Sequence, residues 1–285
     1  MQAGEKIKRT KCFTPTARPP KNEKMFRFPD IERTTYWFFL LLALTSCRGD
    51  GAQDIRNYYF PLRELKEGLV YEYQPMINDS LTPAYWYYRS FFTEEGIFLT
   101  KTYYEYELAP LQLSREEVVS NGMLLEDLYL YENDSTGKQQ KITVEVLSGS
   151  AFPFQVKDSS GVFLYKIQWH PVSDPEATIT LIKNRRYIKD TTIVFEAEER
   201  DAVLFDVREL VEYDKEGVFE HEYSGREVYA EGIGLFYYEK KVAGDFQWAY
   251  RLKERYPMSR LEEQYMRERE GGVRREEGGG SLLIQ

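Results

Sequence analysis

The fold class is decided by one stretch, Val203-Leu204-Phe205-Asp206-Val207-Arg208-Glu209-Leu210-Val211-Glu212-Tyr213. Its odd positions are mostly apolar, whereas three of its five even positions carry a charge. This period of two is typical of a strand that buries one face. A surface helix would repeat its apolar residues every three or four positions. The stretch therefore predicts a long, half-buried β-strand.

Similar short runs, rich in Tyr, Phe, Val and Ile, extend from residue 57 to residue 252. They are residues 69–74, 85–92, 97–107, 124–131, 142–146, 162–169, 178–183, 193–198, 218–223, 228–239 and 246–252. Turn residues such as those at 133–137, 158–161 and 214–217 separate them. This rhythm predicts an antiparallel meander of roughly ten to twelve strands and no βαβ units. We expect a mainly β fold, a single curved antiparallel sheet or half-barrel, although a barrel around an apolar interior is also compatible with the pattern.

The chain changes character after the last strand. Ser259-Arg260-Leu261-Glu262 resembles a capping box and predicts a short C-terminal helix within residues 253–270. Glycines at 271, 272 and 278–280 predict a disordered tail over residues 271–285. With a leader over 1–46 and a flexible tether over 47–56, the β domain is expected to span 57–252.

Charge is distributed unevenly along the chain, whose net charge is −9. Residues 1–46 carry nine basic and four acidic side chains, whereas residues 47–285 carry 29 basic and 43 acidic ones. The body is therefore strongly acidic. An acidic body argues against nucleic acid as a partner, because phosphate binding needs a surplus of Lys and Arg.

The long apolar run covers residues 36–44 and follows Arg27 and Arg33. It is too short to span a bilayer, which takes about 20 apolar residues, but it fits the apolar region of a secretory signal. Leu44-Thr45-Ser46-Cys47, which follows, resembles the lipobox of bacterial lipoproteins. The resemblance implies cleavage between Ser46 and Cys47 and attachment of lipid to Cys47. Two or three acyl chains there would anchor the protein stably to a membrane. The alternative is a buried strand or helix edge with an ordinary buried thiol.

The segment before this signal is unusually long. We predict that translation starts at Met25, with a long basic leader region as the alternative. The chain has two cysteines, Cys12 and Cys47. Cys12 lies in the part that would be removed and Cys47 would carry lipid, so no disulfide is expected in an oxidising compartment.

Two further motifs bracket the β region. The first is Tyr59-Phe60-Pro61-Leu62, followed by Gly68 and Val70-Tyr71-Glu72-Tyr73, and the second is Tyr229-Ala230-Glu231-Gly232-Ile233-Gly234-Leu235. Together they resemble the opening and closing segments of Gram-negative lipoproteins of unknown function. The resemblance implies a curved antiparallel sheet, similar to the half-barrel of lipoprotein-carrying periplasmic proteins, and brings no catalytic residues with it. Read physically, Gly232 and Gly234 predict a bulge or a close backbone approach rather than a dinucleotide-binding loop.

Candidates for catalysis or metal binding are weak. His170 and His221 lack the spacing of a zinc site, and no serine nucleophile motif is present. The carboxylate pairs Glu196/Glu198 and Glu220/Glu222 could imitate a glycosidase dyad or a calcium site, but a solvated sheet face explains them as well. We expect no catalytic residues, no metal site and no cofactor.

Aromatic residues are a stronger hint of function. They cluster in Tyr85-Trp86-Tyr87-Tyr88, Phe91-Phe92 and Tyr103-Tyr104-Glu105-Tyr106, on both faces of successive strands. Such rings could line an apolar cavity, stack on sugars or contact a partner protein. Alternatively, the sheet buries one set and the C-terminal helix with loops buries the other.

The features together predict a lipid-anchored cell-envelope lipoprotein that binds an apolar ligand or a protein partner and is not an enzyme. If the sorting rule of enteric bacteria applies, Arg48 after the lipid-bearing cysteine permits delivery to the outer membrane. A structural or assembly subunit of an envelope complex is one alternative. Carbohydrate binding or hydrolysis is another.

Overall fold

The computed structural model describes residues 51–77, 81–105, 107–157, 161–243 and 246–278. The predicted leader, the lipobox with Cys47 and the end of the predicted tail lie outside these ranges. The elements in chain order are β1 (Gln53–Asp54), η1 (Arg56–Tyr58), η2 (Glu64–Lys66), β2 (Leu69–Pro75), β3 (Ala84–Phe92), β4 (Ile97–Tyr104), β5 (Pro110–Val119), β6 (Gly122–Asn133), β7 (Gln139–Pro153), β8 (Gln155–Val156), β9 (Val162–Trp169), β10 (Thr178–Phe195), β11 (Glu198–Asp214), β12 (Val218–Ala230), β13 (Gly234–Ala243), β14 (Phe246–Tyr256) and α2 (Met258–Gly278).

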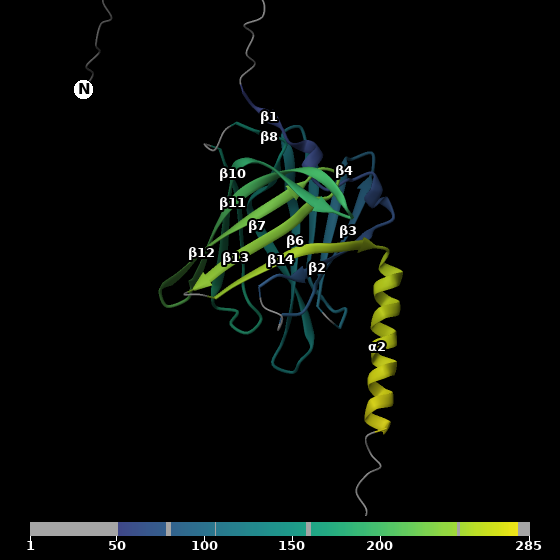
Figure 1. The fold of residues 1–285 in the computed structure, drawn as a ribbon. Helices are drawn as coiled ribbons and strands as arrows, with labels where there is room; N and C mark the ends of the chain where they lie inside the picture. The colour runs from purple at the N-terminus through teal and green to yellow at the C-terminus, as the bar shows by residue number, and fades with distance from the viewer. Residues whose placement is uncertain (1–50, 78–80, 106, 158–160, 244–245, 279–285) are drawn as a thin grey trace, which may run out of the picture. The chain divides into compact units, whose positions relative to one another are not determined.

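Twelve of the strands form one closed antiparallel barrel (Figure 1). Their order around the barrel is β10-β11-β12-β13-β14-β2-β3-β4-β5-β6-β7-β9, and β9 pairs again with β10. The expected open curved sheet or half-barrel is therefore wrong, while the mainly β class and the C-terminal helix are confirmed. Closure comes from the pairing of β14 with β2, which joins the two ends of the meander. Pairing the ends removes exposed strand edges, which would otherwise template aggregation.

The alternation predicted for the stretch at 203–213 is present in β11. Val203, Phe205 and Val207 are buried inside the barrel at 0–4% exposure. Their neighbours at even positions point to the outer face, where Asp206 pairs with Arg186 of β10. The antiparallel pairing of β10 with β11 runs from Thr178–Asp214 to Phe195–Glu198, with one irregularity after Tyr187. These two long strands form the largest hairpin of the described chain.

The N-terminal segment closes one end of the barrel from inside. Ile55, Tyr59, Phe60 and Leu65 are each at most 4% exposed and belong to the main apolar core. β1 pairs with β8, and the backbone N–H of Ile55 donates to the carbonyl of Phe154 at 2.8 Å. We call residues 55–66 the plug.

The two bracketing motifs meet at the plug. Phe60 stacks on Tyr88 with ring centroids 4.2 Å apart, and the Tyr71 hydroxyl donates to the Ile233 carbonyl at 3.0 Å. Gly232 and Gly234 have φ of +68° and +95°, and the β12–β13 register shifts at Val228/Tyr229. The predicted close approach is confirmed at Gly234, against which Phe60 packs, whereas the bulge lies two residues later, at Phe236, and Gly232 lies in the turn between β12 and β13.

The start of α2 packs on the outer face of the barrel. Leu261 is 3% exposed and clusters with Val70 and Tyr256, against which Tyr85 and Tyr87 also pack. Figure 1 shows the rest of α2 extending away from the strands. The helix, expected within 253–270, begins at Met258 because β14 continues to Tyr256, and it runs on to Gly278, into the range 271–285 that was expected to be a disordered tail. Among helices in the described ranges, none is long and apolar enough to cross a bilayer.

Substituting Gly234 by Ala should strongly destabilise the barrel. An added Cβ would lie 2.5 Å from Cδ1 of Phe60, and the backbone has φ of +95°. Overpacking and backbone strain each cost about 1–3 kcal/mol, so we expect a loss of roughly 2–4 kcal/mol in the free energy of unfolding. Urea denaturation of both proteins measures it.

Gly232→Ala is the matched control. Its added Cβ would meet only Arg200, at 3.7 Å, so only the backbone cost of about 1–2 kcal/mol remains. Equal losses in the two variants would show that the contact between Phe60 and Gly234 is not tight.

Candidate functional site

The barrel interior contains a chain of alternating charges. A closed barrel of eight strands is just filled by its own side chains, so twelve strands leave a wider lumen. The plug and aromatic core fill one end. Long charged side chains from β10, β11, β12 and β13 occupy the next layer: Lys183, Arg185, Glu209, Glu227 and Lys240. We call these five residues the charge chain.

Two carboxylates bridge three cations in the charge chain. Glu227 accepts from Arg185 Nε at 2.7 Å and from Lys183 Nζ at 2.6 Å. Lys183 also lies 3.2 Å from Glu209, which forms a second ion pair with Lys240. The sequence of charges is therefore plus, minus, plus, minus, plus, and the chain carries a net charge of +1.

Further hydrogen bonds fix the inner end of the charge chain. Arg185 donates from Nη1 to the Ala151 carbonyl at 3.2 Å, and the Tyr229 hydroxyl donates to Glu227 at 3.1 Å. Glu227 is only 5% exposed. A buried carboxylate with this many donors satisfies the requirement that buried charges be paired and hydrogen-bonded.

Both carboxylates of the charge chain are held ionised. Burial alone would raise the pKa of Glu227, but Arg185 and Lys183 outweigh it and hold this pKa well below its usual range. Burial would also raise the pKa of Glu209, but the positive charges of Lys183 and Lys240 outweigh burial and lower this pKa. Neither carboxyl group is therefore suited to donate a proton near neutral pH.

A second ion pair lies beside the plug. Lys101 Nζ is 2.5 Å from Glu116, which also accepts from the Tyr59 hydroxyl. Glu116 is 5% exposed. Burial lowers the pKa of Lys101 and raises that of Tyr59, while Glu116 raises both. This pair is neutral overall and ties β4 and β5 to the plug.

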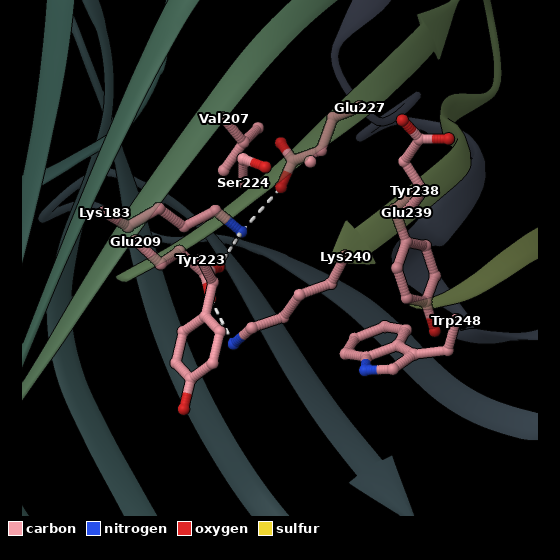
Figure 2. Close-up of a pocket in the computed structure, with 11 residues that line it drawn as sticks. Lys183, Val207, Glu209, Tyr223, Ser224, Glu227, Tyr238, Glu239, Lys240 and Trp248 are labelled. Atoms are coloured by element: carbon pink, nitrogen blue, oxygen red, sulfur yellow. Dashed lines mark ion pairs between the residues drawn. The ribbon is translucent and has the colours of Figure 1, made fainter. Parts of the chain in front are cut away.

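A pocket of about 40 Å³ opens beside the outer end of the charge chain (Figure 2). It is lined by Lys183, Val207, Glu209, Tyr223, Ser224, Gly225, Glu227, Tyr238, Glu239, Lys240 and Trp248. A volume of this size holds about three water molecules, far less than an acyl chain requires. We call it the lumen pocket. It lies toward the hairpin ends near 214–217 and 243–246, away from the plug.

Half-buried aromatic rings flank the lumen pocket. Tyr238 lies 5.8 Å from Trp248 in an edge-to-face pair and 5.4 Å from Tyr250 in a stacked one. Trp86 and Tyr103 stack at 4.9 Å and pack against the same core. We call Trp86, Tyr103, Tyr238, Trp248 and Tyr250 the aromatic wall. Of these five, Tyr238 and Trp248 line the lumen pocket, and both are only partly buried, so their ring surface is open to a ligand there.

The aromatic clusters predicted from sequence divide between two surroundings. Trp86, Tyr88 and Tyr103 pack with the main core, whereas Tyr85 and Tyr87 pack beside α2 on the outer face. Phe91 and Phe92 are 38% and 43% exposed. The alternative in which the sheet and the C-terminal helix each cover one set is thus supported for residues 85–88.

The two predicted carboxylate pairs differ in the structure: Glu220 and Glu222 lie two positions apart in β12 and share one of its faces, whereas Glu196 and Glu198 do not. Glu196 lies in the turn between β10 and β11 with φ of +53°, so it shares no strand face with Glu198, which pairs with Arg200. His170 contacts the Ala177 carbonyl at 2.8 Å. His221 is exposed on β12, as are Glu220 and Glu222.

No cluster of three or more His, Cys, Asp or Glu suited to a metal ion occurs among the described residues. Cys47, the predicted lipid attachment residue, and Ser46 lie outside the described ranges. The charge chain itself was not predicted. Its one sequence signal is Glu209, a charged side chain on the otherwise apolar face of the stretch at 203–213.

Comparison with known proteins does not assign this chain to a family. No protein-family model matches the sequence, and no curated protein matches it. A crystal structure described as a "putative lipoprotein" from Parabacteroides distasonis is 12% identical, with a TM-score of 0.43 over 72% of this chain and all of that one. A "putative exported protein with YmcC-like fold" from Bacteroides fragilis is 13% identical, with a TM-score of 0.41 over 70% of this chain and 98% of that one. Similarity this low assigns neither a fold nor a function here.

Substituting Glu227 by Gln should strongly destabilise the barrel at neutral pH. The variant leaves the buried Arg185 without its carboxylate partner, and Lys183 loses one of its two carboxylate partners. Removing one partner of a buried pair costs about 3–5 kcal/mol, which urea denaturation can measure. Asp206→Asn, which breaks the exposed pair with Arg186 at 3.5 Å, is the control and should cost less than about 1 kcal/mol.

The loss in the free energy of unfolding caused by Glu227→Gln should also depend on pH. The pKa of Glu227 in the folded protein lies below its ordinary value of 4.5, so its ion pairs stabilise fully above that pH. Below it the unfolded chain takes up a proton first, and the difference between Glu227→Gln and the unmodified protein should shrink. A difference that stays constant down to about pH 3 would contradict the ionised state assigned to Glu227.

Proposed function

We propose that this protein is a lipid-anchored cell-envelope binding protein, not an enzyme, that holds a small polar ligand at the lumen pocket. The observation that carries the proposal is the pocket itself. It combines charged groups with partly exposed rings inside a barrel whose other end is filled by the plug. Ligand sites in barrels commonly lie at such a mouth.

Energetics support a functional role for the charge chain. Replacing buried ion pairs by apolar residues of similar volume is often neutral or stabilising, so stability alone does not favour five charged side chains here. The barrel core elsewhere is apolar and aromatic. Charges retained beside a pocket are consistent with recognition of a ligand.

The site fits a polar ligand better than the apolar one expected from sequence. An apolar molecule would have to displace water from Lys183, Glu209 and Lys240 without replacing its hydrogen bonds. The pocket volume of about 40 Å³ also excludes a long acyl chain. The low pKa of Glu209 and Glu227 favours binding over acid–base chemistry.

Substituting Cys47 by Ala in the full chain should release the protein from membranes. Without the thiol no lipid can be attached at this position, and the lipid is the anchor that the proposal assigns. Metabolic labelling with palmitate and membrane fractionation in a Gram-negative host measure the effect. Cys12→Ala is the matched control and should keep the label. Labelled Cys47→Ala protein, or unlabelled protein with Cys47 intact, would contradict the anchor.

Substituting Trp248 by Ala should abolish ligand retention. We would incubate the full-length protein with the small-molecule fraction of its host cells and measure bound mass by native mass spectrometry. The unmodified protein should retain a small molecule that Trp248→Ala lacks. Phe92→Ala, which removes an exposed ring away from the pocket, should retain it. Identical masses for the unmodified protein and Trp248→Ala would refute binding at the pocket.

A further inference from the structure

The charge chain has an unbalanced outer end. Lys240 is its last member and has one carboxylate partner, Glu209, among the described residues. An ammonium group has three N–H donors, so Lys240 has donating capacity left. Lys183 has two carboxylate partners and likewise retains one donor. Both side chains line the lumen pocket.

The surplus of one positive charge belongs to the interior rather than to the surface. The neighbouring pair of Lys101 and Glu116 is neutral, and the nearby Glu239 is occupied elsewhere, by the Tyr237 hydroxyl at 2.7 Å and by Arg226 at 3.8 Å. The surplus also contrasts with the net charge of −9 for the whole chain. A partly desolvated excess charge favours an anion of equal and opposite charge.

Pocket size sets the size of the anionic group. About 40 Å³ accommodates a group as large as a carboxylate, but not a whole sugar or aromatic ring. The remainder of a ligand must therefore lie outside the pocket. Figure 2 shows Trp248 and Tyr238 beside Lys240, at the position where that remainder would be.

The aromatic residues around Lys240 suit a ring. Trp248 is the cross-strand partner of Lys240, and Tyr223 places its ring 4.2 Å from the Lys240 ammonium on the other side. Flat, partly exposed rings offer apolar faces against which a planar or saturated ring can stack. One ligand could thus place its carboxylate at Lys240 and stack its ring on Trp248 at the same time.

We infer that the lumen pocket binds a ring-bearing monocarboxylate, with its carboxylate at Lys240 and Lys183 and its ring against Trp248 and Tyr238. The inference rests on the proposed binding function and specifies its ligand class. An acidic sugar and an aromatic acid share this chemistry. Binding transfers no atom or proton, because the carboxylate is already ionised near neutral pH.

The test is calorimetric titration of the full-length protein with four probes: D-glucuronate, benzoate, D-glucose and acetate. We expect glucuronate or benzoate to bind at least about tenfold more tightly than both glucose and acetate, because charge and ring contribute together. Tighter binding of glucuronate would identify the ligand as a sugar acid, and tighter binding of benzoate would identify it as an aromatic acid. Equal affinity for charged and neutral probes, or equal affinity for acetate and the ring acids, overturns the inference.

Lys240→Met tests the assigned cation while keeping an apolar stem of similar length. It should lose about tenfold or more in affinity for the ring acid. Lys241→Met is the matched control, because it removes an exposed lysine from the next position of β13. Circular dichroism and thermal unfolding verify that both variants fold. Unchanged affinity in Lys240→Met overturns the inference.

Failure of this inference is distinguishable from failure of the binding function. A neutral small molecule retained by the unmodified protein but not by Trp248→Ala would exclude the acidic ligand and leave binding intact. Absence of any retained molecule, together with no heat from the four probes, would refute both.

Discussion

Closing twelve strands into one barrel creates an interior that the strands cannot fill by themselves. The rest of the structure depends on how that space is occupied. At one end the plug inserts Ile55, Phe60 and Leu65 among the rings of the core. Farther along the described part of the barrel, long charged side chains from the wall strands span the interior. The lumen pocket is a part of the described interior that neither the plug nor these side chains fill.

Filling the middle of the barrel with charge imposes a strict requirement. Each buried ion must have a partner, because an isolated carboxylate or ammonium in the interior is far less stable than in water. In the charge chain each carboxylate pairs with two cations. Glu227 pairs with Arg185 and Lys183, and Glu209 pairs with Lys183 and Lys240. A row that begins and ends with a cation cannot be neutral. The surplus of one positive charge thus follows from the order of residues on four neighbouring strands, and Lys240 places one end of the row at the pocket.

The sequence predicts the strands well and their closure poorly, and the reason is physical. Alternation in the stretch at 203–213 is a local property, and β11 reproduces it. The pairing of β2 with β14 joins residues about 180 positions apart and leaves no local pattern. The charge chain combines single residues such as Lys183, Glu209 and Lys240, each of which reads alone as an ordinary surface charge. The carboxylate pairs that stood out in the sequence are close along the chain. A turn separates Glu196 from Glu198, and Glu220 and Glu222 are exposed to solvent.

The plug also has a consequence for the order in which the protein can fold. Phe60 packs on Gly234, and Asn57 accepts a hydrogen bond from Gly232, so the first described segment depends on strands near the end of the chain. Contacts between residues so distant in sequence form late and slowly, since loop closure must precede them. If the chain is exported, as the proposal requires, it would therefore cross a membrane with its N-terminal aromatic residues still uncovered. Only when β13 and β14 have arrived can the barrel close around them, so the half-made protein depends on being kept from aggregating until the last strand is delivered.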